Sequence, residues 1–265
     1  MINNLYFCEN IHIMKRLILD RVIAGEKVMN LSKEFNIPFQ TIYCWCYKKN
    51  IDCNTKKRVK TNPFDLTNLD VQYYIGLLAT DGCVTNNRNI NISLTDEYPI
   101  KKFAEFLNIN YYTKFYGKSM RYIISFSNKE VFDFLGSIGI VPNKSRTLTI
   151  STPITWSMLR GIMDGDGSYL YRLYNGKISR QASLKLSSIS FVTQVSEFLN
   201  TNNIKNNISI DTYHGYPQYK LNIHTKDISR YYDNLYYDGC VYIHRKRETL
   251  KLIVNHIDKR FAKSK

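Results

Sequence analysis

Two nine-residue segments of this chain repeat one pattern, and they constrain its fold more than any other feature. Each is an apolar helical run that carries small residues four positions apart and closes on Asp-Gly. The first covers Tyr74–Gly82 and the second covers Leu159–Gly167. Residues four apart lie on one face of a helix, and small side chains there let two backbones approach closely. The repeat therefore predicts two equivalent helices side by side, with Asp81 and Asp166 at adjacent ends.

The predicted position of these two aspartates is electrostatically unfavourable. The C-terminal end of a helix carries partial negative charge, and two nearby carboxylates repel each other. A divalent cation relieves both problems, and carboxylate oxygens together with water suit Mg²⁺ better than zinc. Mg²⁺ held there would activate water and stabilise the leaving oxygen of a phosphodiester. We expect the following glycines, Gly82 and Gly167, to adopt left-handed cap conformations.

Charge and composition favour nucleic acid as the partner. The chain has 37 Lys and Arg against 22 Asp and Glu, a formal net charge of +15, which predicts attraction to polyanions. No apolar run approaches the roughly 20 residues of a membrane-spanning helix, and the N-terminus lacks the pattern of a signal peptide. The six scattered cysteines indicate reduced thiols and an intracellular location, wherever the target DNA lies. The spacing of Cys44, Cys46 and Cys53 does not favour zinc.

Residues 1–52 read as a small helical domain, with helices predicted over 11–24, 29–35 and from Pro38 onward. The spacing between Leu31 and Trp45 resembles the helix-turn-helix of recombinases and transposase-like proteins, whose last helix enters the major groove. That resemblance directs Gln40, Thr41 and Cys44 toward DNA and places Lys48 near phosphates. The alternative is a three-helix packing module without a DNA contact. In the first helix, the predicted buried face comprises Ile13, Leu17, Ile18 and Val22.

After a polar and basic linker over residues 53–68, one α+β architecture is used twice, over 69–153 and 154–265. The first half is expected to hold helices at 70–81, 98–107 and 130–138, and strands at 89–95, 114–116 and 122–126. The second half is expected to hold helices at 155–166, 191–199, 228–237 and 247–257, and strands at 183–187, 208–210 and 220–223. A longer hairpin is expected around 174–177.

Polar side chains on the predicted strands form a candidate DNA-contacting surface. A β-ribbon is thin enough to enter the major groove, where all four base pairs are distinguishable. The ordinary alternative is a solvated sheet face. The candidate contacts are Asn91, Ser93, Lys185 and Arg180, together with Asn89, Arg172 and Lys220.

Both nine-residue segments resemble the LAGLIDADG signature of homing endonucleases, and residues 138–145 and 235–247 resemble the ends of that family's two repeats. The resemblance implies a monomer whose two pseudo-symmetric αββαββα halves straddle a long, imperfectly symmetric site on double-stranded DNA. It also implies Mg²⁺-dependent cleavage of both strands across the minor groove, leaving short 3′ overhangs. Asp81 and Asp166 would hold the metal and the scissile phosphates, with Gly82 and Gly167 beside them at the metal site.

The same resemblance implies a basic catalytic residue in each half. Lys144 matches such a lysine in the first half, and Lys246 is the choice in the second, where His244 and Arg245 compete. For Lys144, a phosphate contact or a solvated surface position is the alternative. Asp96 and Ser188 follow equivalent strands and are candidates for ordering water. Asp164 has only Ala79 as its counterpart, so it is not expected to form half of a catalytic pair.

The sequence therefore predicts a sequence-specific double-strand DNA endonuclease with a helix-turn-helix arm. The rival interpretation is a non-cleaving protein on the same scaffold, either a DNA-binding regulator or a maturase acting on intron RNA. Retention of both aspartates favours cleavage, because without a metal two close carboxylates near phosphate only weaken binding.

Overall fold

The computed structural model divides into two compact units, 1–57 and 58–265. The described residues are 2–24, 26–49, 51, 59, 61–174, 177–213 and 215–262, with side chains described over 13–24, 26–49, 51, 59, 61–173, 178–213 and 215–257. The division between the units falls inside the predicted linker, of which residues 53–58 and 60 lie outside the described residues. Residues 175–176, at the centre of the predicted long hairpin, also lie outside them. Across the described residues, no helix is long and apolar enough to cross a membrane.

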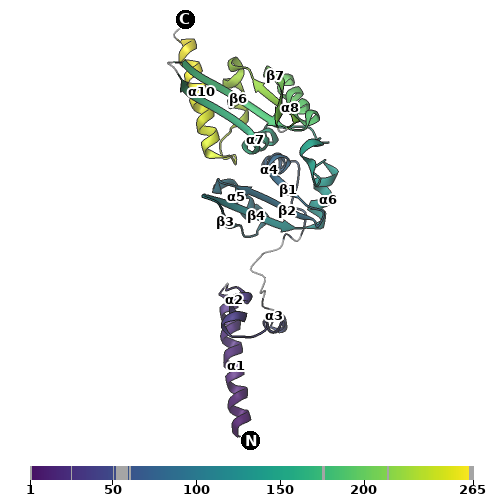
Figure 1. Cartoon of the computed structure of the whole chain (residues 1–265), viewed down its shortest axis with the longest axis vertical. Helices are drawn as coiled ribbons and strands as arrows, with labels where there is room; N and C mark the ends of the chain where they lie inside the picture. Colours follow the sequence, from purple (N-terminus) through teal and green to yellow (C-terminus); the bar gives the residue numbers. More distant parts are fainter. Residues whose placement is uncertain are drawn as a thin grey trace. The chain divides into compact units, whose positions relative to one another are not determined.

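The smaller unit consists of α1 (Ile2–Ile23), α2 (Val28–Glu34) and α3 (Phe39–Lys48) (Figure 1). As predicted, α3 begins directly after Pro38, whose fixed φ suits a helix start. The prediction for α1 was partly wrong, because Ile13 and Leu17 are 67% and 47% exposed. Only two short helices cover α1, so its buried stripe is narrow. The core consists of Ile18, Leu19, Val22, Val28, Leu31, Ile42 and Cys46.

Arg21 fastens α1 to the segment that follows it. Its Nε and Nη2 atoms donate to Glu26 at 2.7 and 2.8 Å, and its Nη1 and Nη2 atoms donate to Glu34 at 2.6 and 2.9 Å. Hydrogen bonds to both carboxylates raise the pKa of Arg21. These bidentate contacts fix where α2 begins and so orient the turn that leads to α3.

The larger unit repeats the order αββαββα, as the resemblance implied. The first half contains α4 (Leu69–Thr80), β1 (Gly82–Val84), β2 (Asn89–Leu94), α5 (Glu97–Leu107), β3 (Tyr112–Tyr116), β4 (Ser119–Ser127) and α6 (Lys129–Ser137). The second contains α7 (Trp156–Gly165), β5 (Gly167–Tyr174), β6 (Lys177–Leu186), α8 (Ile189–Thr201), β7 (Asn206–Tyr213), β8 (Tyr216–Ile223) and α9 (Ile228–Leu235). A 3₁₀ turn, η1 (Lys144–Arg146), lies between the halves; a second, η2 (Thr225–Asp227), precedes α9, and α10 (His244–Ala262) follows it.

Each half has one antiparallel sheet, ordered β1-β2-β4-β3 and β5-β6-β8-β7. Alternation along β2 buries Ile90, Ile92 and Leu94 and leaves the polar residues between them half-buried. The strand β1 was not among those that the residue pattern predicted, and β5 was expected only as one arm of the hairpin around 174–177. Both start on the glycine of the Asp-Gly motif, so the helical pattern masks their first residues.

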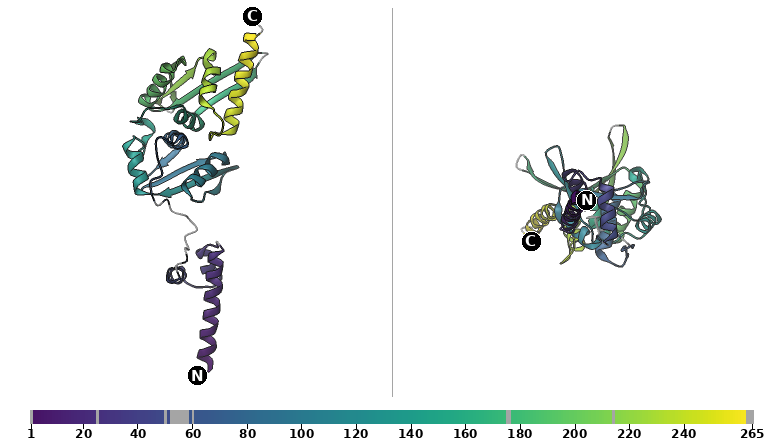
Figure 2. Two further views of the ribbon diagram at one scale, coloured as in Figure 1. Left: turned by 180° about the vertical axis from the view of Figure 1, so that it is seen from behind. Right: turned by 90° about the horizontal axis from the view of Figure 1, so that it is seen from below.

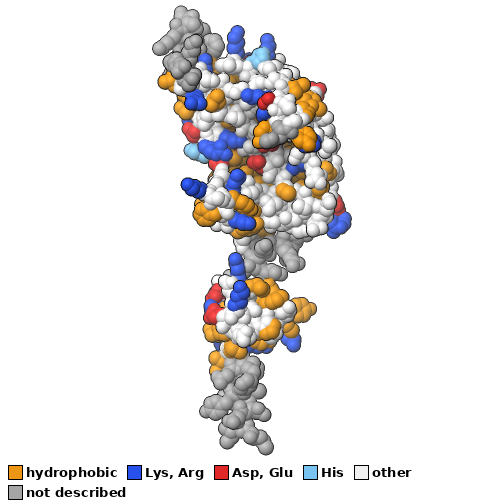
Figure 3. Space-filling model, viewed as in Figure 1, with side chains coloured by type: hydrophobic (Ala, Val, Ile, Leu, Met, Phe, Trp, Pro, Cys, Tyr) orange, Lys and Arg blue, Asp and Glu red, His pale blue; other side chains and the backbone are white. Residues whose placement is uncertain are grey.

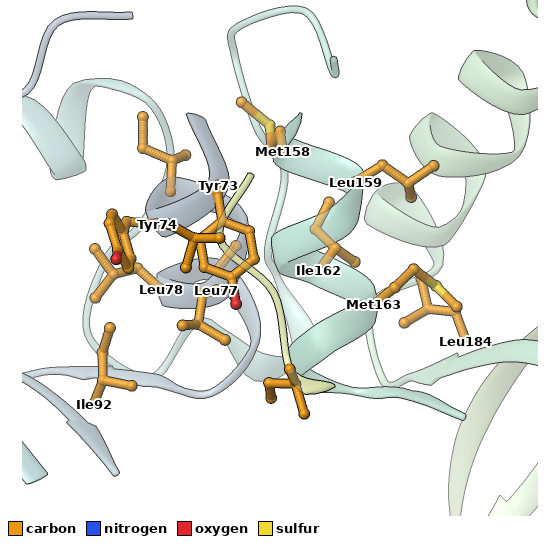
Figure 4. Packing of buried hydrophobic residues seen from close by; sticks show 14 of the residues in the cluster. Tyr73, Tyr74, Leu77, Leu78, Ile92, Met158, Leu159, Ile162, Met163 and Leu184 are labelled. Carbon is orange, nitrogen blue, oxygen red and sulfur yellow. The ribbon is translucent and has the colours of Figure 1, made fainter. Parts of the chain in front are cut away.

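The helices α4 and α7 lie side by side between the two sheets (Figures 1 and 2). A Cβ atom built on Gly161 would lie 2.0 Å from the Tyr73 carbonyl oxygen, and one on Gly76 would lie 2.0 Å from the Met158 carbonyl oxygen. The two backbones are therefore in direct contact at the predicted small residues. On the outer sides of this contact, the larger side chains of both helices enter the half-cores, with Leu159 and Met163 on the side of α7 away from α4 (Figure 4).

We expect Gly161→Ala to lower the free energy of unfolding by about 3 kcal/mol, because the added methyl group overlaps the backbone of α4. Urea unfolding measures the effect. Gly136→Ala is the matched control: Gly136 lies in α6, where a Cβ would meet nothing within 4 Å. It should raise stability by about 0.5–1 kcal/mol through helix propensity. An equal change in the free energy of unfolding for the two variants would contradict a close contact between α4 and α7.

Candidate active site

The structure places both motif aspartates at the ends of the paired helices. Asp81 ends α4 and Asp166 ends α7, each with helical backbone angles. The expectation of left-handed glycines was wrong, because neither Gly82 nor Gly167 has a positive φ. After each motif the chain instead passes directly into a strand. A Cβ atom at either glycine would lie 2.4 Å from a carbonyl oxygen in the last turn of the preceding helix. Glycine is required here for close approach.

The two carboxylates reach solvent but lie among protein atoms that exclude much of the surrounding water. Burial, followed by the charge of Asp81, raises the pKa of Asp166 to about 6. Burial also raises the pKa of Asp81, while Lys246, Arg121 and other cations partly offset the rise. The repulsion shows that the carboxylates share one electrostatic environment. No salt bridge of the described residues pairs either of them.

The two predicted lysines are buried beside these aspartates and bind backbone oxygens. Lys246 Nζ donates to the carbonyl groups of Met163, Asp164, Gly165 and Gly167 at 2.7–2.9 Å. Lys144 Nζ donates to the carbonyl oxygen of Gly82. Lys144 is only 7% exposed, which rules out the solvated surface position considered for it. Burial lowers the pKa of both lysines, and nearby acidic groups counteract it.

The same bonds involve both glycines expected beside the aspartates at the metal site. The carbonyl oxygens of Gly82 and Gly167 already accept hydrogen bonds from the two ammonium groups. A metal cation on the same oxygens would lie against a positive charge. In this arrangement the carboxylates of Asp81 and Asp166 are the oxygens without a lysine hydrogen bond. The Lys246 ammonium, bound to carbonyl oxygens of the last turn, offsets the negative end of α7.

Of the two candidates for ordering water, Ser188 is buried and uses its hydroxyl group in hydrogen bonds to the backbone. It is 2% exposed, its hydroxyl donates to the Leu148 carbonyl at 2.7 Å, and it accepts from the Phe191 amide. Asp96 instead forms an ion pair with Arg245 across the two halves, with Nη2 and Oδ2 3.0 Å apart. Arg245 also lowers the pKa of Asp81.

A buried polar network behind the site escaped the sequence analysis. Asp164 Oδ2 accepts from the Tyr73 hydroxyl at 2.9 Å and from the Ile243 amide at 2.7 Å. The guanidinium of Arg160 donates to the carbonyl oxygens of Val241 and Leu235. These bonds tie α7 to the segment that leads into Arg245 and Lys246. Asp164 is therefore a structural residue, and burial raises its pKa to about 7.

Arg121 was also not identified from the sequence as a residue near the site, although the alternation along its strand could have indicated it. It lies on β4 opposite Lys114, on the face that carries Ser125 and Asn91. Its charge lowers the pKa of Asp81. Alternation counted back from the buried Ile124 would have placed Arg121 on the polar face.

The polar sheet faces hold six of the seven strand residues expected to contact DNA. Asn91 and Ser93 are half-buried on β2, and Lys185 is exposed on β6, where it pairs with Asp211 at 2.6 Å. Arg180 was placed wrongly. It has the same parity as the buried Ala182 and Leu184, so it lies on the opposite face of β6. Figure 3 shows Lys and Arg side chains gathered near the junction of the two halves.

A hollow of about 310 Å³ adjoins the acidic pair on the Asp166 side. It is lined by polar groups of both halves, among them Thr80, Ser145, Asp166, Lys185 and Gln218. Within the described residues, no group of three or more His, Cys, Asp or Glu side chains forms a metal cluster. The acidic pair is thus an open two-carboxylate site that adjoins a cationic surface.

In the smaller unit, α3 presents most of its predicted contact residues to solvent. Gln40, Cys44 and Lys48 are exposed and Thr41 is half-buried, while Ile42 and Cys46 face the core. Three aromatic residues, Phe39, Tyr43 and Tyr47, also reach solvent on this helix.

No family model and no curated protein matches this sequence. Solved structures do resemble it. The homing endonuclease I-WcaI bound to its DNA recognition sequence aligns at 19% identity over 69% of this chain and 85% of its own, with a TM-score of 0.49. The LAGLIDADG meganuclease I-AabMI bound to uncleaved DNA aligns at 13% identity over 77% of this chain and 92% of its own, with a TM-score of 0.46. At these values the similarity does not by itself assign an activity.

We expect Asp166→Asn to stabilise the metal-free protein at pH 7.5 by about 1 kcal/mol, a value reduced for the solvent that reaches the carboxylate. The folded-state pKa of about 6 exceeds the ordinary 3.8. The unfolded chain therefore ionises first as pH rises, and stability falls between these values. The stabilisation should shrink at about pH 4.5, as urea unfolding with a chelator would show. Asp133→Asn, an exposed charge on α6, should give no such gain.

Proposed function

We propose that this protein is a sequence-specific double-strand DNA endonuclease of the LAGLIDADG homing type, acting as a monomer on a long, imperfectly symmetric site. The observation that carries the proposal is the junction of α4 and α7. There, two repeated segments bring Asp81 and Asp166 into one electrostatic environment, between two sheets whose polar faces carry cationic groups. One such carboxylate at each repeat fits one cleavage event on each DNA strand.

The donor set fits a hard divalent cation. Two carboxylates with raised pKa values gain from a nearby positive charge, and neither is paired by a salt bridge in the described chain. Asp81 and Asp166 would hold Mg²⁺ with water completing the coordination. When bound, Mg²⁺ supplies charge stabilisation to the scissile phosphate and lowers the pKa of coordinated water.

Other residues of the chain would position the carboxylates, supply positive charge and contact the DNA. Lys144 and Lys246 hold the backbone that follows each aspartate, so they position the carboxylates. Arg121 and Arg245 bring positive charge to the Asp81 side, where DNA phosphates would approach. Asn91, Ser93 and Lys185 would contact base edges or phosphates from the sheet faces.

The α1–α3 unit is proposed to be a helix-turn-helix arm that lengthens the target. The exposed Gln40 and Cys44, with the half-buried Thr41, would face base edges, and Lys48 would contact phosphate.

The central test measures binding and cleavage separately. Duplexes spanning the insertion region of the protein's own gene are incubated with intact protein, Asp81→Asn and Asp166→Asn, with and without Mg²⁺. We expect the intact protein to cut both strands and each variant to lose at least 100-fold in rate while still binding, since the variants lose only metal-holding charge. Asp133→Asn is the matched control and should cut normally. Tight binding by intact protein without Mg²⁺-dependent cutting would favour a non-cleaving regulator, and selective binding of intron RNA would favour a maturase.

Metal binding has a readout that does not require DNA. We expect Mg²⁺ to raise the thermal midpoint of the intact protein, because it binds only the folded pair of carboxylates. The shift should be lost in the Asp81→Asn/Asp166→Asn double variant and kept in Asp133→Asn. An equal shift in all three would show that the cation binds elsewhere.

For the arm, we expect Gln40→Ala/Thr41→Ala to weaken binding about tenfold and to shorten the protected footprint, without moving the cleavage position. Asn30→Ala, an exposed polar residue on α2, is the control. An unchanged footprint would show that α3 does not contact the DNA.

A further inference from the structure

The segment that connects the two halves carries Lys144 into the site of the first half. Lys144 lies in η1, and its ammonium group donates to the carbonyl oxygen of Gly82, next to Asp81. Burial lowers the pKa of Lys144, and the charges that counteract this shift include those of Asp166 and Asp81. The lysine is therefore close to both motif carboxylates, and its position depends on where the connecting segment is held.

The second half holds this connecting segment at alternate residues. The Leu148 carbonyl accepts a hydrogen bond of 2.7 Å from the hydroxyl group of Ser188, which caps α8. The Gln194 side chain, also on α8, accepts from the Ile150 amide at 3.0 Å and donates to the Ile150 carbonyl at 2.8 Å. Both Leu148 and Ile150 bury their side chains in the core. Residues 148–150 are therefore fixed to the second half.

Arg146, two residues before Leu148, makes the next contact with the second half. Its guanidinium carbon lies 3.8 Å from the centroid of the Tyr216 ring, where β8 begins. A guanidinium group at this distance over an aromatic face is attracted by the ring electrons. Arg146 and Tyr216 are both exposed, so neither side chain fills the core. The contact extends the attachment of the connecting segment into η1, two residues from Lys144.

The contact between Arg146 and Tyr216 also joins two walls of the hollow beside Asp166. Ser145 of η1 and Gln218 of β8 both line this hollow of about 310 Å³. Arg146 directly follows the first of these lining residues, and Tyr216 lies two residues before the second. The contact therefore sets the spacing of η1 and β8 beside one motif carboxylate, while the same turn holds the backbone beside the other.

We propose that Arg146 is a positioning residue for cleavage. By stacking on Tyr216 it fixes η1, and so it keeps Lys144 on the backbone that follows the first motif aspartate. The inference rests on the proposed function, because it concerns the rate of that cleavage. Lys246 has another support, since the carboxylate of Asp164 binds the backbone just before α10. A change at Arg146 therefore acts through Lys144 and not through the lysine of the second half.

The test measures single-turnover cutting of each strand in Mg²⁺, with saturating full-length protein and a duplex that the intact protein cuts. Arg146→Ala should slow cutting about threefold to fivefold, while the dissociation constant in Mg²⁺-free buffer stays unchanged. Its effect on the two strands should follow the preference shown by Lys144→Met. Adding Arg146→Ala to Lys144→Met should cause no further slowing, because the arginine acts through this lysine.

Variants of the ring separate stacking from other effects of the arginine. Tyr216→Phe keeps the aromatic face and should cut at the intact rate, whereas Tyr216→Ala should match Arg146→Ala. The Arg146→Ala/Tyr216→Ala double variant should be no slower than either single variant, because both remove the same contact. Arg230→Ala is the control: it removes an exposed arginine of α9 that donates to the Asn203 carbonyl, and it should slow neither strand.

Other outcomes separate the two proposals. Weaker binding by Arg146→Ala with unchanged saturating rates would indicate a DNA contact and would overturn the inference. Further slowing when Arg146→Ala is added to Lys144→Met would also overturn it, as would a strand preference unlike that of Lys144→Met. Each of these results leaves the endonuclease intact. Failure of the intact protein to cut any duplex in Mg²⁺ would instead count against the proposed function itself.

Discussion

The backbone contact between α4 and α7 is the constraint on which the larger unit depends. Gly76 and Gly161 each lie where a Cβ would overlap a carbonyl oxygen of the other helix. Because the helices meet this closely, the two half-cores join into one cluster that includes residues from both sheets. The same contact holds two negatively polarised helix ends close together although they repel each other. The structure thus accepts an electrostatic cost at the acidic pair, and the buried Lys246 reduces it by binding carbonyl oxygens at the end of α7.

The buried network behind the site has a different purpose from the acidic pair, although both contain aspartate. Asp164 and Arg160 bind backbone groups between Leu235 and Ile243 and so fix the start of α10. Lys246 then reaches back to the end of α7. In the first half, Lys144 makes the corresponding contact without such a network. In both halves, therefore, a lysine holds the glycine that follows the motif aspartate, and in the second half the Asp164 and Arg160 hydrogen bonds also support that lysine's segment.

Sequence alone predicted the duplicated helices and the order of the main elements, because a repeated motif and hydrophobic periodicity are local properties. The choice of Lys144 and Lys246 came from the family resemblance, and their catalytic role stays a prediction. It failed where tertiary contacts decide. Gly82 and Gly167 are required for close approach and not for a left-handed turn, which no local pattern distinguishes. The misplacement of Arg180 came from ignoring strand parity, and the partners of Arg160 and Tyr73 lie far away in the chain. The exposure of Ile13 and Leu17 depends on how little of α1 is covered.

Anchoring both acidic side chains to one helix junction has a consequence for engineering. Any change that shifts α4 against α7 displaces both carboxylates together, so a substitution in this junction acts on the two halves at once. A change meant to affect one half alone has to be made at the periphery, where the halves differ: Asp96 pairs with Arg245, whereas the corresponding Ser188 is buried.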